Sequence, residues 1–165
     1  MKILITGIPG SGKSLISQEI KKKFPKLKFM VLNDKDFSIS KKIGDYDKET
    51  KEYVVDIVKL NNETKLIFSS NKKNIIFEGH LWPEISKKTL VKFDYIFYLD
   101  ISEKNLRKRL EERNYNQVKI EENLFCLKNS YIPTILKKNN LSYHKILVDD
   151  NLKLNFNKIN KFLAL

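Results

Sequence analysis

An eight-residue glycine-rich segment near the N-terminus constrains the fold of this chain more than any other feature. Residues 7–14 read Gly-Ile-Pro-Gly-Ser-Gly-Lys-Ser and match the pattern G-x-x-x-x-G-K-[ST] without gaps. An apolar run at 2–6 precedes the segment, and a helical pattern with apolar residues at every fourth position follows it. A strand that ends in such a turn and continues as a helix is the context that this motif requires.

Each residue type in this segment has a physical role in binding phosphate. Gly7, Gly10 and Gly12 let backbone N–H groups turn inward around phosphate oxygens, and the following helix N-terminus adds positive potential. Lys13 can reach the β- and γ-phosphates, and the Ser14 hydroxyl can ligate Mg²⁺. The segment therefore predicts that the chain binds ATP or another nucleoside triphosphate with Mg²⁺, and it leaves the phosphoryl acceptor open.

Short apolar runs alternate with helical patterns along the whole chain. The runs that predict strands lie at 2–6, 28–32, 74–77, 94–99 and 144–148. Helices are expected from Lys13, after the cap residues Asp56 and Ser102, and from Leu152 to Leu165. This alternation predicts an α/β fold of the P-loop NTPase class, with a five-stranded parallel sheet and helices on both faces, in a single domain over residues 1–165.

Three stretches do not fit this alternation simply. Residues 33–51 are polar and poorly periodic, which predicts a mobile or substrate-facing segment. Pro83 can occupy the first turn of a short helix. Pro133 falls inside a helical pattern and predicts a kink or break at that residue.

Polar residues follow the predicted strands at their carboxyl ends, and ligands of open α/β sheets bind at that edge. The segments concerned are 7–14, Asn33 to Asp36, Glu78 to His80, Asp100, and Asp149 to Asn151. They are expected to converge on one site. Glu78 and Asp100 are both candidates for a carboxylate that supports the metal. Glu78 has the better neighbours, because Gly79 permits close approach and His80 offers a neutral hydrogen-bonding group.

The only arginines of the chain are Arg107, Arg109 and Arg113, which lie within seven residues. Arginine binds phosphate with two parallel hydrogen bonds, so this cluster in a lysine-rich chain predicts a specific task. The segment after the fourth strand is expected to act as a lid that neutralises the transferring phosphoryl group and excludes water. Arg113 is the best candidate for the lid arginine, Arg109 lies one helical turn earlier on the same face, and Arg107 is offset from both.

The chain carries a formal charge of +12, from 32 basic and 20 acidic residues. Two interpretations stay open, a codon composition that favours lysine, and a surface that binds nucleic acid or the ribosome. No apolar stretch reaches the ~20 residues that cross a membrane, and the first residues lack the long apolar segment of a signal peptide. With Cys126 as the only cysteine, we expect a protein of the reducing cytoplasm without a membrane partner.

The sequence resembles the adenylate kinase isoenzyme six family, also called the coilin-interacting nuclear ATPase family, including its archaeal members. The segments that carry the resemblance extend from Ile3 to about Asn123. They are the loop at 7–14, Gly44-Asp45-Tyr46-Asp47, Tyr53-Val54-Val55-Asp56, Glu78-Gly79-His80 and Arg109-Leu110-Glu111-Glu112-Arg113-Asn114-Tyr115-Asn116. The Arg-Asn-Tyr-Asn stretch and His80 are more specific than the loop, which many families share.

The resemblance implies an adenylate-kinase-like fold with a monophosphate-binding region near 30–52 and a short lid near 112–122. It implies phosphoryl transfer from ATP to AMP or a related monophosphate, ATPase activity, and a role in maturing the small ribosomal subunit of the pre-ribosome, through a small-subunit ribosomal protein. The residues that would contact the ATP phosphates are Gly7, Gly10, Gly12, Lys13, Ser14 and Leu15, with Arg113 from the lid.

The resemblance also implies roles for the remaining site residues. Lys13, Arg109 and Arg113 would stabilise the transferring phosphoryl group. Ser14 and Glu78 would place Mg²⁺, and Glu78 with His80 would support the metal and a water molecule. The acceptor would lie against residues 33–47, with Asn33, Asp36 and Asp45 as the candidates.

Three positions depart from the family pattern. Glu78 stands where the family usually carries aspartate, and Leu15 stands where a second Ser or Thr often follows. Residues 37–40 lack the usual arginine, so the AMP phosphate would need Lys41, Lys42 or the backbone. A nucleoside monophosphate kinase and a ribosome-assembly ATPase with little kinase activity therefore both stay open, with a kinase for another small acceptor as a third hypothesis.

Overall fold

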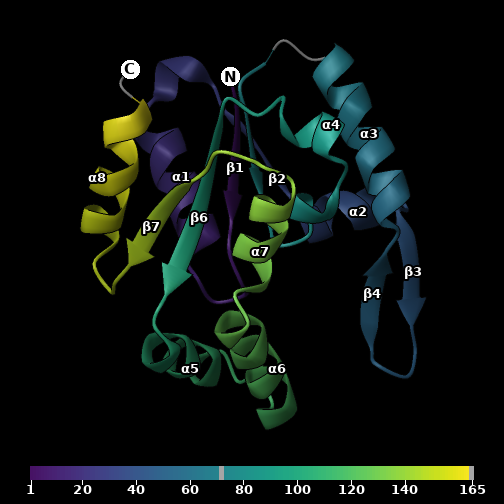
Figure 1. Ribbon diagram of the computed structural model, residues 1–165, viewed down its shortest axis with the longest axis vertical. Helices are drawn as coiled ribbons and strands as arrows, with labels where there is room; N and C mark the ends of the chain where they lie inside the picture. Colours follow the sequence, from purple (N-terminus) through teal and green to yellow (C-terminus); the bar gives the residue numbers. More distant parts are fainter. Residues whose placement is uncertain (71–72, 164–165) are drawn as a thin grey trace.

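The computed structural model describes residues 1–70 and 73–163 and confirms the predicted five-stranded parallel sheet (Figure 1). Its strands are β1 (Lys2–Thr6), β2 (Met30–Asn33), β5 (Ile75–Glu78), β6 (Tyr95–Ile101) and β7 (His144–Val148). Their order is β2-β5-β1-β6-β7, and all four pairings are parallel. Every residue of β1 is buried, as expected for a strand covered on both faces.

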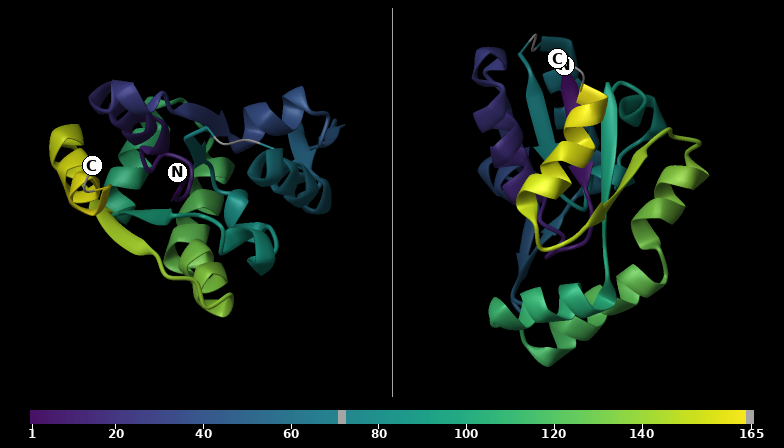
Figure 2. Two further views of the ribbon diagram at one scale, coloured as in Figure 1. Left: turned by 90° about the horizontal axis from the view of Figure 1, so that it is seen from above. Right: turned by 90° about the vertical axis from the view of Figure 1, so that its left-hand side faces the viewer.

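Helices cover both faces of the sheet (Figure 2). Helices α1 (Lys13–Lys23) and α8 (Leu152–Leu163) pack against each other on one face, while α3 (Ile57–Ser70), α4 (Lys87–Leu90) and α7 (Tyr131–Lys138) lie on the other. Helices α5 (Glu103–Glu112) and α6 (Gln117–Lys128) lie together beyond the carboxyl ends of the strands. The last two residues of the predicted closing helix, 164 and 165, lie outside the described residues. No helix of the described part is long and apolar enough to cross a membrane.

Residues 33–51, predicted to be a mobile or substrate-facing segment, form regular secondary structure that the sequence pattern did not indicate. This segment forms α2 (Asp34–Ser40) and the strand β3 (Gly44–Asp47), which pairs antiparallel with β4 (Glu52–Val55) to form a hairpin. The Asn33 side chain caps α2 by accepting hydrogen bonds from the N–H groups of residues 35 and 36. These elements are short and half exposed, so they bury too few apolar residues to give a clear periodic signal.

The predicted break at Pro133 is also misplaced. The chain breaks between α6 and α7 at residues 129 and 130, where Ser130 adopts a left-handed φ of 48°. Pro133 lies in the first turn of α7, where a missing N–H costs no helical hydrogen bond. Pro83 does open a short helix, the 3₁₀ turn η2 (Trp82–Glu84). The predicted caps are confirmed, because Ser102 accepts from the N–H of residue 105 and Asp56 accepts from two N–H groups at the start of α3.

An aromatic cluster fills the core between β5 and the helices on one face. The Phe77 ring packs edge-on against both Trp82 and Phe93, with ring centroids 5.1 Å apart in each pair, and lies parallel to Phe68 at 5.7 Å. Phe77 and Trp82 are completely buried. This cluster fixes the end of β5, which carries the acidic residue of the site described below.

We expect Phe77→Ala to destabilise the protein by about 3–5 kcal/mol, because it leaves a cavity among three aromatic rings. Phe125→Ala is the matched control, since the Phe125 side chain on α6 is 69% exposed and its loss is expected to cost no more than about 0.5 kcal/mol. Urea unfolding followed by circular dichroism measures both values. Equal losses in the two variants would contradict the packing described here.

Candidate active site

The phosphate loop runs from the end of β1 into α1 and needs glycine at its turns. Gly10 and Gly12 adopt left-handed φ angles of 89° and 95°, which other residues rarely adopt. A Cβ at Gly10 would also lie 2.8 Å from Leu106, so the loop rests directly on α5. No side chain caps the start of α1 among the described residues, which leaves the N-terminal amides of the helix available for phosphate.

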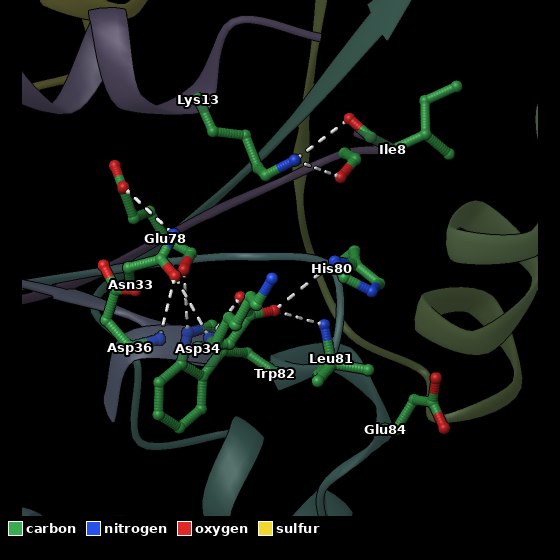
Figure 3. A network of polar contacts seen from close by, with 12 residues as sticks. Ile8, Lys13, Asn33, Asp34, Asp36, Glu78, His80, Leu81, Trp82 and Glu84 are labelled. Carbon is green, nitrogen blue, oxygen red and sulfur yellow. Dashed lines mark hydrogen bonds and ion pairs between the residues drawn. The ribbon is translucent and has the colours of Figure 1, made fainter. Parts of the chain in front are cut away.

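Lys13 folds back over this loop. Its ammonium donates hydrogen bonds to the carbonyl oxygens of Gly7 at 2.8 Å and Ile8 at 3.0 Å (Figure 3). Burial lowers the pKa of Lys13 to about 8, which the carboxylates of Asp34 and Glu78 oppose. The loop therefore encloses the Lys13 ammonium. The phosphates of a nucleotide could replace the two carbonyl oxygens as the hydrogen-bond partners of this ammonium.

A buried carboxylate joins the phosphate loop to the neighbouring strands. Glu78 ends β5, and its Oε1 accepts hydrogen bonds from the Ser14 hydroxyl at 2.9 Å and from the Asn33 amide at 3.3 Å. The Trp82 indole N–H donates to the Glu78 backbone carbonyl at 3.1 Å, which anchors the strand end. The predicted metal residues Ser14 and Glu78 are thus in direct contact, and the predicted acceptor residue Asn33 lies against them.

The donor set fits Mg²⁺. Glu78 Oε2 is buried and has no hydrogen-bond partner among the described residues, although a buried carboxylate oxygen normally has one. A carboxylate beside a hydroxyl at a phosphate loop provides the oxygen ligands that Mg²⁺ prefers. The alternative, Asp100, is engaged elsewhere: it pairs with Lys145 at 2.8 Å and accepts from the Tyr98 hydroxyl at 3.3 Å. The structure therefore favours Glu78 over Asp100 at the metal.

A second buried carboxylate, Asp34, was missed at the sequence level. It lies at the start of α2, is 3% exposed, and accepts a hydrogen bond from the Leu81 N–H at 2.8 Å. Its Oδ2 also lies 3.6 Å from Nδ1 of His80. A Cβ at Gly79 would overlap the Asp34 carboxylate, so glycine is required by this close approach. An acidic residue directly after a predicted strand is the signal that could have found Asp34.

His80 lies beside the Asp34 carboxylate at the edge of the site (Figure 3). Burial lowers the pKa of His80, and the nearby Asp34 carboxylate opposes that change. The imidazole is therefore neutral at physiological pH and offers both a donor and an acceptor. The predicted grouping of Glu78, His80 and the phosphate loop at one edge of the sheet is present in the structure.

The arginines of α5 separate into three environments. Arg109 donates to the Gly10 carbonyl at 3.3 Å and, on the other side, to the Asp149 carbonyl and the Asp150 carboxylate at 3.0 Å each. Arg113 ends α5 with its side chain exposed, and its charge helps to lower the pKa of Lys13. Arg107 pairs with Glu121 on α6 instead. Arg109 and Arg113 thus lie on the phosphate-loop side, as expected.

A cleft of about 640 Å³ opens next to the phosphate loop. Its walls come from the phosphate loop, the β3–β4 hairpin, the end of β5, and α6 with α7; they include Ile8, Pro9, Tyr53, Val55, His80, Leu81, Asn123 and Tyr131. Lys119 of α6 forms ion pairs with Glu52 of the hairpin and with Glu122, so it joins two walls of the cleft. The cleft offers a largely apolar space that ends at the phosphate loop.

Several predicted residues lie away from this cleft. Asp36 is exposed on α2 and Asp45 is exposed on β3, and neither is among the described residues that line the cleft. Lys41 is exposed and pairs with Glu63 at 3.9 Å, and Lys42 is also exposed outside the cleft. Leu15 is half exposed on the first turn of α1, where its N–H faces the loop end of the helix. The proposed roles of these residues stay predictions.

Sequence comparison identifies the family. The profile of a family described as "AAA domain" matches residues 3–128. The adenylate kinase isoenzyme 6 homolog of Caenorhabditis elegans is 30% identical over 152 residues, which cover 90% of this chain and 77% of that protein. The chain belongs to the adenylate kinase isoenzyme 6 family. The resemblance inferred from the loop, His80 and the Arg-Asn-Tyr-Asn stretch is thereby confirmed.

A further relative agrees with this family, and two solved structures share the fold. A relative from Methanococcus maripaludis carries the name of an adenylate kinase and is 36% identical over 133 residues. These residues cover 75% of this chain and 65% of that protein. The chain thus spans just under two thirds of that relative. The deoxyadenosine kinase from M. mycoides with bound dATP shares the fold at a TM-score of 0.62 and 21% identity over all of both chains. Shikimate kinase from Acinetobacter baumannii shares the fold at a TM-score of 0.65 and 13% identity, over 99% of this chain and 93% of that one.

Nucleotide binding is expected to take up a proton at Lys13. The phosphates favour the charged ammonium and raise its pKa from about 8, so binding at pH 8 takes up roughly half a proton and weakens as the pH rises further. Titration calorimetry of a non-hydrolysable ATP analogue, in buffers with different ionisation enthalpies, measures this uptake.

Lys13→Arg is the control for this measurement. A guanidinium does not titrate in this range, so the variant retains only the nucleotide's own proton exchange. The same buffer dependence in both proteins would show that Lys13 is fully charged before the nucleotide binds.

Proposed function

We propose that this adenylate-kinase-like protein transfers the γ-phosphoryl group of ATP to AMP or a related nucleoside monophosphate. The observation that carries the proposal is the continuity of the cleft with the phosphate loop: Ile8 and Pro9 of the loop line the same space as His80 and the β3–β4 hairpin. A donor held by the loop and an acceptor held in the cleft would meet beside His80. Such alignment of two bound reactants accounts for much of catalysis in phosphoryl transfer.

On the donor side, the backbone amides of the loop and the start of α1 would hold the phosphates of ATP. Lys13 would leave the carbonyls of Gly7 and Ile8 and pair with the β- and γ-phosphates. Arg109 already contacts the loop at Gly10, and Arg113 is free to turn inward. These three cations would neutralise the charge that develops on the transferring group.

Ser14 and Glu78 would hold Mg²⁺, with Asn33 orienting the Glu78 carboxylate. When bound, the metal neutralises phosphate charge and fixes the donor's geometry. The neutral His80 imidazole would hydrogen-bond a water or phosphate oxygen next to this carboxylate, and Asp34 would hold the imidazole ring in place.

On the acceptor side, we assign the contact with the monophosphate to Lys35. The lysines that line the cleft in the described part of the chain are Lys35, Lys51 and Lys119. Lys119 is already paired with Glu52 and Glu122. Lys35 follows the buried Asp34, and its backbone N–H donates hydrogen bonds to the side chains of Asn33 and Asp34, which fix its position at the cleft. Its ammonium could replace the arginine that residues 37–40 lack.

A coupled assay that supplies ATP, Mg²⁺ and each nucleoside monophosphate in turn tests the proposed reaction. We expect ADP formation that depends on AMP or a related monophosphate, and Lys13→Met is expected to abolish it, because the loop then lacks its central cation. Folded protein without monophosphate-dependent turnover would reject the kinase proposal. Unchanged turnover in the Lys13→Met variant would overturn the assignment of the loop.

We expect Lys35→Met to raise the KM for AMP about tenfold, the equivalent of ~1.4 kcal/mol, while the KM for ATP stays within about twofold. Lys35→Arg is expected to restore the affinity for AMP, because the positive charge returns. Lys41→Met is the matched control, since Lys41 lies outside the cleft. A larger effect in Lys41→Met than in Lys35→Met would reassign the acceptor phosphate to the end of α2.

A second candidate is a ribosome-assembly ATPase that acts on a small-subunit ribosomal protein and has little kinase activity. The specific observation in its favour is that no arginine lines the cleft in the described part of the chain, although bidentate arginine contacts are the stronger phosphate ligands. This candidate predicts ATP hydrolysis without any monophosphate and co-purification with a small-subunit ribosomal protein. We place either activity in the cytoplasm, as suits a chain whose one cysteine is a free thiol.

A further inference from the structure

Six exposed lysines gather at the edge of the sheet opposite the phosphate loop. Lys21, Lys22 and Lys23 form the last turn of α1, Lys26 and Lys28 lie in and after the 3₁₀ turn η1 (Pro25–Leu27), and Lys161 lies in the last turn of α8. We call this set the lysine pole. Its nearest member, Lys21, lies eight residues along α1 from Lys13, or about 12 Å of helix.

The packing of two helices brings the lysine pole together. Helices α1 and α8 lie side by side on one face of the sheet, and their C-terminal ends meet near the top of Figure 1 and at the left of the first view in Figure 2. The Phe24 ring at the end of α1 contacts the Phe156 ring of α8, with centroids 6.4 Å apart. The lysines of both helix ends therefore face the same solvent region.

The charge of the lysine pole is not neutralised within the described protein. None of its six lysines forms an ion pair with a described residue, and the sequence holds no Asp or Glu between Glu19 and Asp34, nor anywhere in α8. Some lysines elsewhere do pair with a carboxylate, among them Lys41, Lys128 and Lys145. A general excess of lysine does not explain a stretch without acids from residue 20 to residue 33 in a chain of 20 acidic residues.

Helix dipoles do not account for this charge either. The C-terminus of a helix carries the equivalent of about half a negative charge, so the ends of α1 and α8 together supply about one. Six lysines exceed that requirement several-fold. The excess positive potential is therefore directed at solvent, where it attracts a polyanion.

Most apolar residues between these lysines point inward. Phe29 is buried, and Phe24 and Leu27 are partly buried against the core. Phe162, next to Lys161, is 39% exposed and stacks on His144 at 3.9 Å. Proteins that bind a lipid surface combine basic residues with apolar side chains that insert into it. The pole presents six ammonium groups and one partly exposed apolar ring, Phe162, which suits phosphates in water better than a bilayer.

We propose that the lysine pole binds the phosphate backbone of a nucleic acid, at a site separate from the nucleotide cleft. This inference does not depend on the kinase proposal, because it rests on the charges at the far end of α1. The contacts would be electrostatic and independent of sequence. ATP and the nucleic acid could bind at the same time.

Fluorescence anisotropy of a labelled single-stranded RNA of about 20 nucleotides tests the proposal, with duplex DNA of equal length in a parallel arm. If all six lysines contact phosphates, log K is expected to fall with log salt at a slope of about −4. Lys21→Gln, Lys22→Gln and Lys23→Gln combined are expected to weaken binding at least tenfold and to reduce the slope by about 2. Binding of either nucleic acid supports the proposal, and the preferred one identifies the source.

A matched triple variant keeps this test specific. Lys48→Gln, Lys104→Gln and Lys108→Gln combined remove the same charge from exposed lysines on the hairpin turn and on α5, and binding is expected to stay within about twofold of wild type. Equal losses in both triple variants would show that net charge alone drives binding and would overturn the proposal. So would absence of binding at low salt, or binding only to vesicles of phosphatidylcholine with phosphatidylserine.

ATP turnover of the pole variant separates this inference from the proposed function. The triple variant at residues 21–23 is expected to keep wild-type turnover, because the altered side chains lie at the opposite end of α1 from the phosphate loop. Lys26→Gln with Lys161→Gln is a second variant that leaves the helix interior of α1 untouched and is expected to weaken binding as well. Wild-type RNA affinity in both variants would place the binding surface elsewhere.

Discussion

The hydrogen bond between the Ser14 hydroxyl and the Glu78 carboxylate holds the site together. It joins the first turn of α1 to the end of β5, and the Asn33 amide adds the end of β2 to the same carboxylate oxygen. Three segments far apart in the sequence thereby meet at one buried acidic group. The packing of Phe77 against Trp82, and the hydrogen bond from the Trp82 indole to the Glu78 carbonyl, fix the position of Glu78 relative to the phosphate loop. The chemistry of the loop therefore depends on the aromatic core beneath it.

Much of the fold was predictable because its parallel strands are short, apolar and separated by capped helices. The phosphate loop, the caps at Asp56 and Ser102, and the convergence of Glu78 and His80 with the loop all follow from local patterns. The α2 helix and the β3 strand did not, because elements of four to seven residues with one exposed face carry little periodic signal. Their position beside the phosphate loop depends on tertiary packing, which local sequence patterns do not reveal.

Site residues were predictable where a sequence motif marks them. They were harder to predict where only burial in the fold distinguishes one polar residue from its neighbour. Asp34 and Asp36 are two residues apart on one helical turn, and only the fold shows that the first is enclosed by Gly79 and Leu81 while the second faces solvent. Lys35 was overlooked for the same reason, since one exposed lysine among 29 has no distinguishing local pattern. The arginines were recognised because the chain has so few of them.

The close packing at Gly79, which leaves no space for a Cβ, limits which parts of the molecule can move. The Asp34 carboxylate occupies the space where a Cβ would lie and accepts a hydrogen bond from the Leu81 N–H, so separating β2 from β5 would break this bond and the close packing at Gly79. Any closure around a reactant must then come from the hairpin and from α5 with α6, which the Lys119–Glu52 pair already links. The hydrogen-bonded ends of β2 and β5 thus form the base of the site, on which the hairpin and the α5–α6 pair stand as its sides.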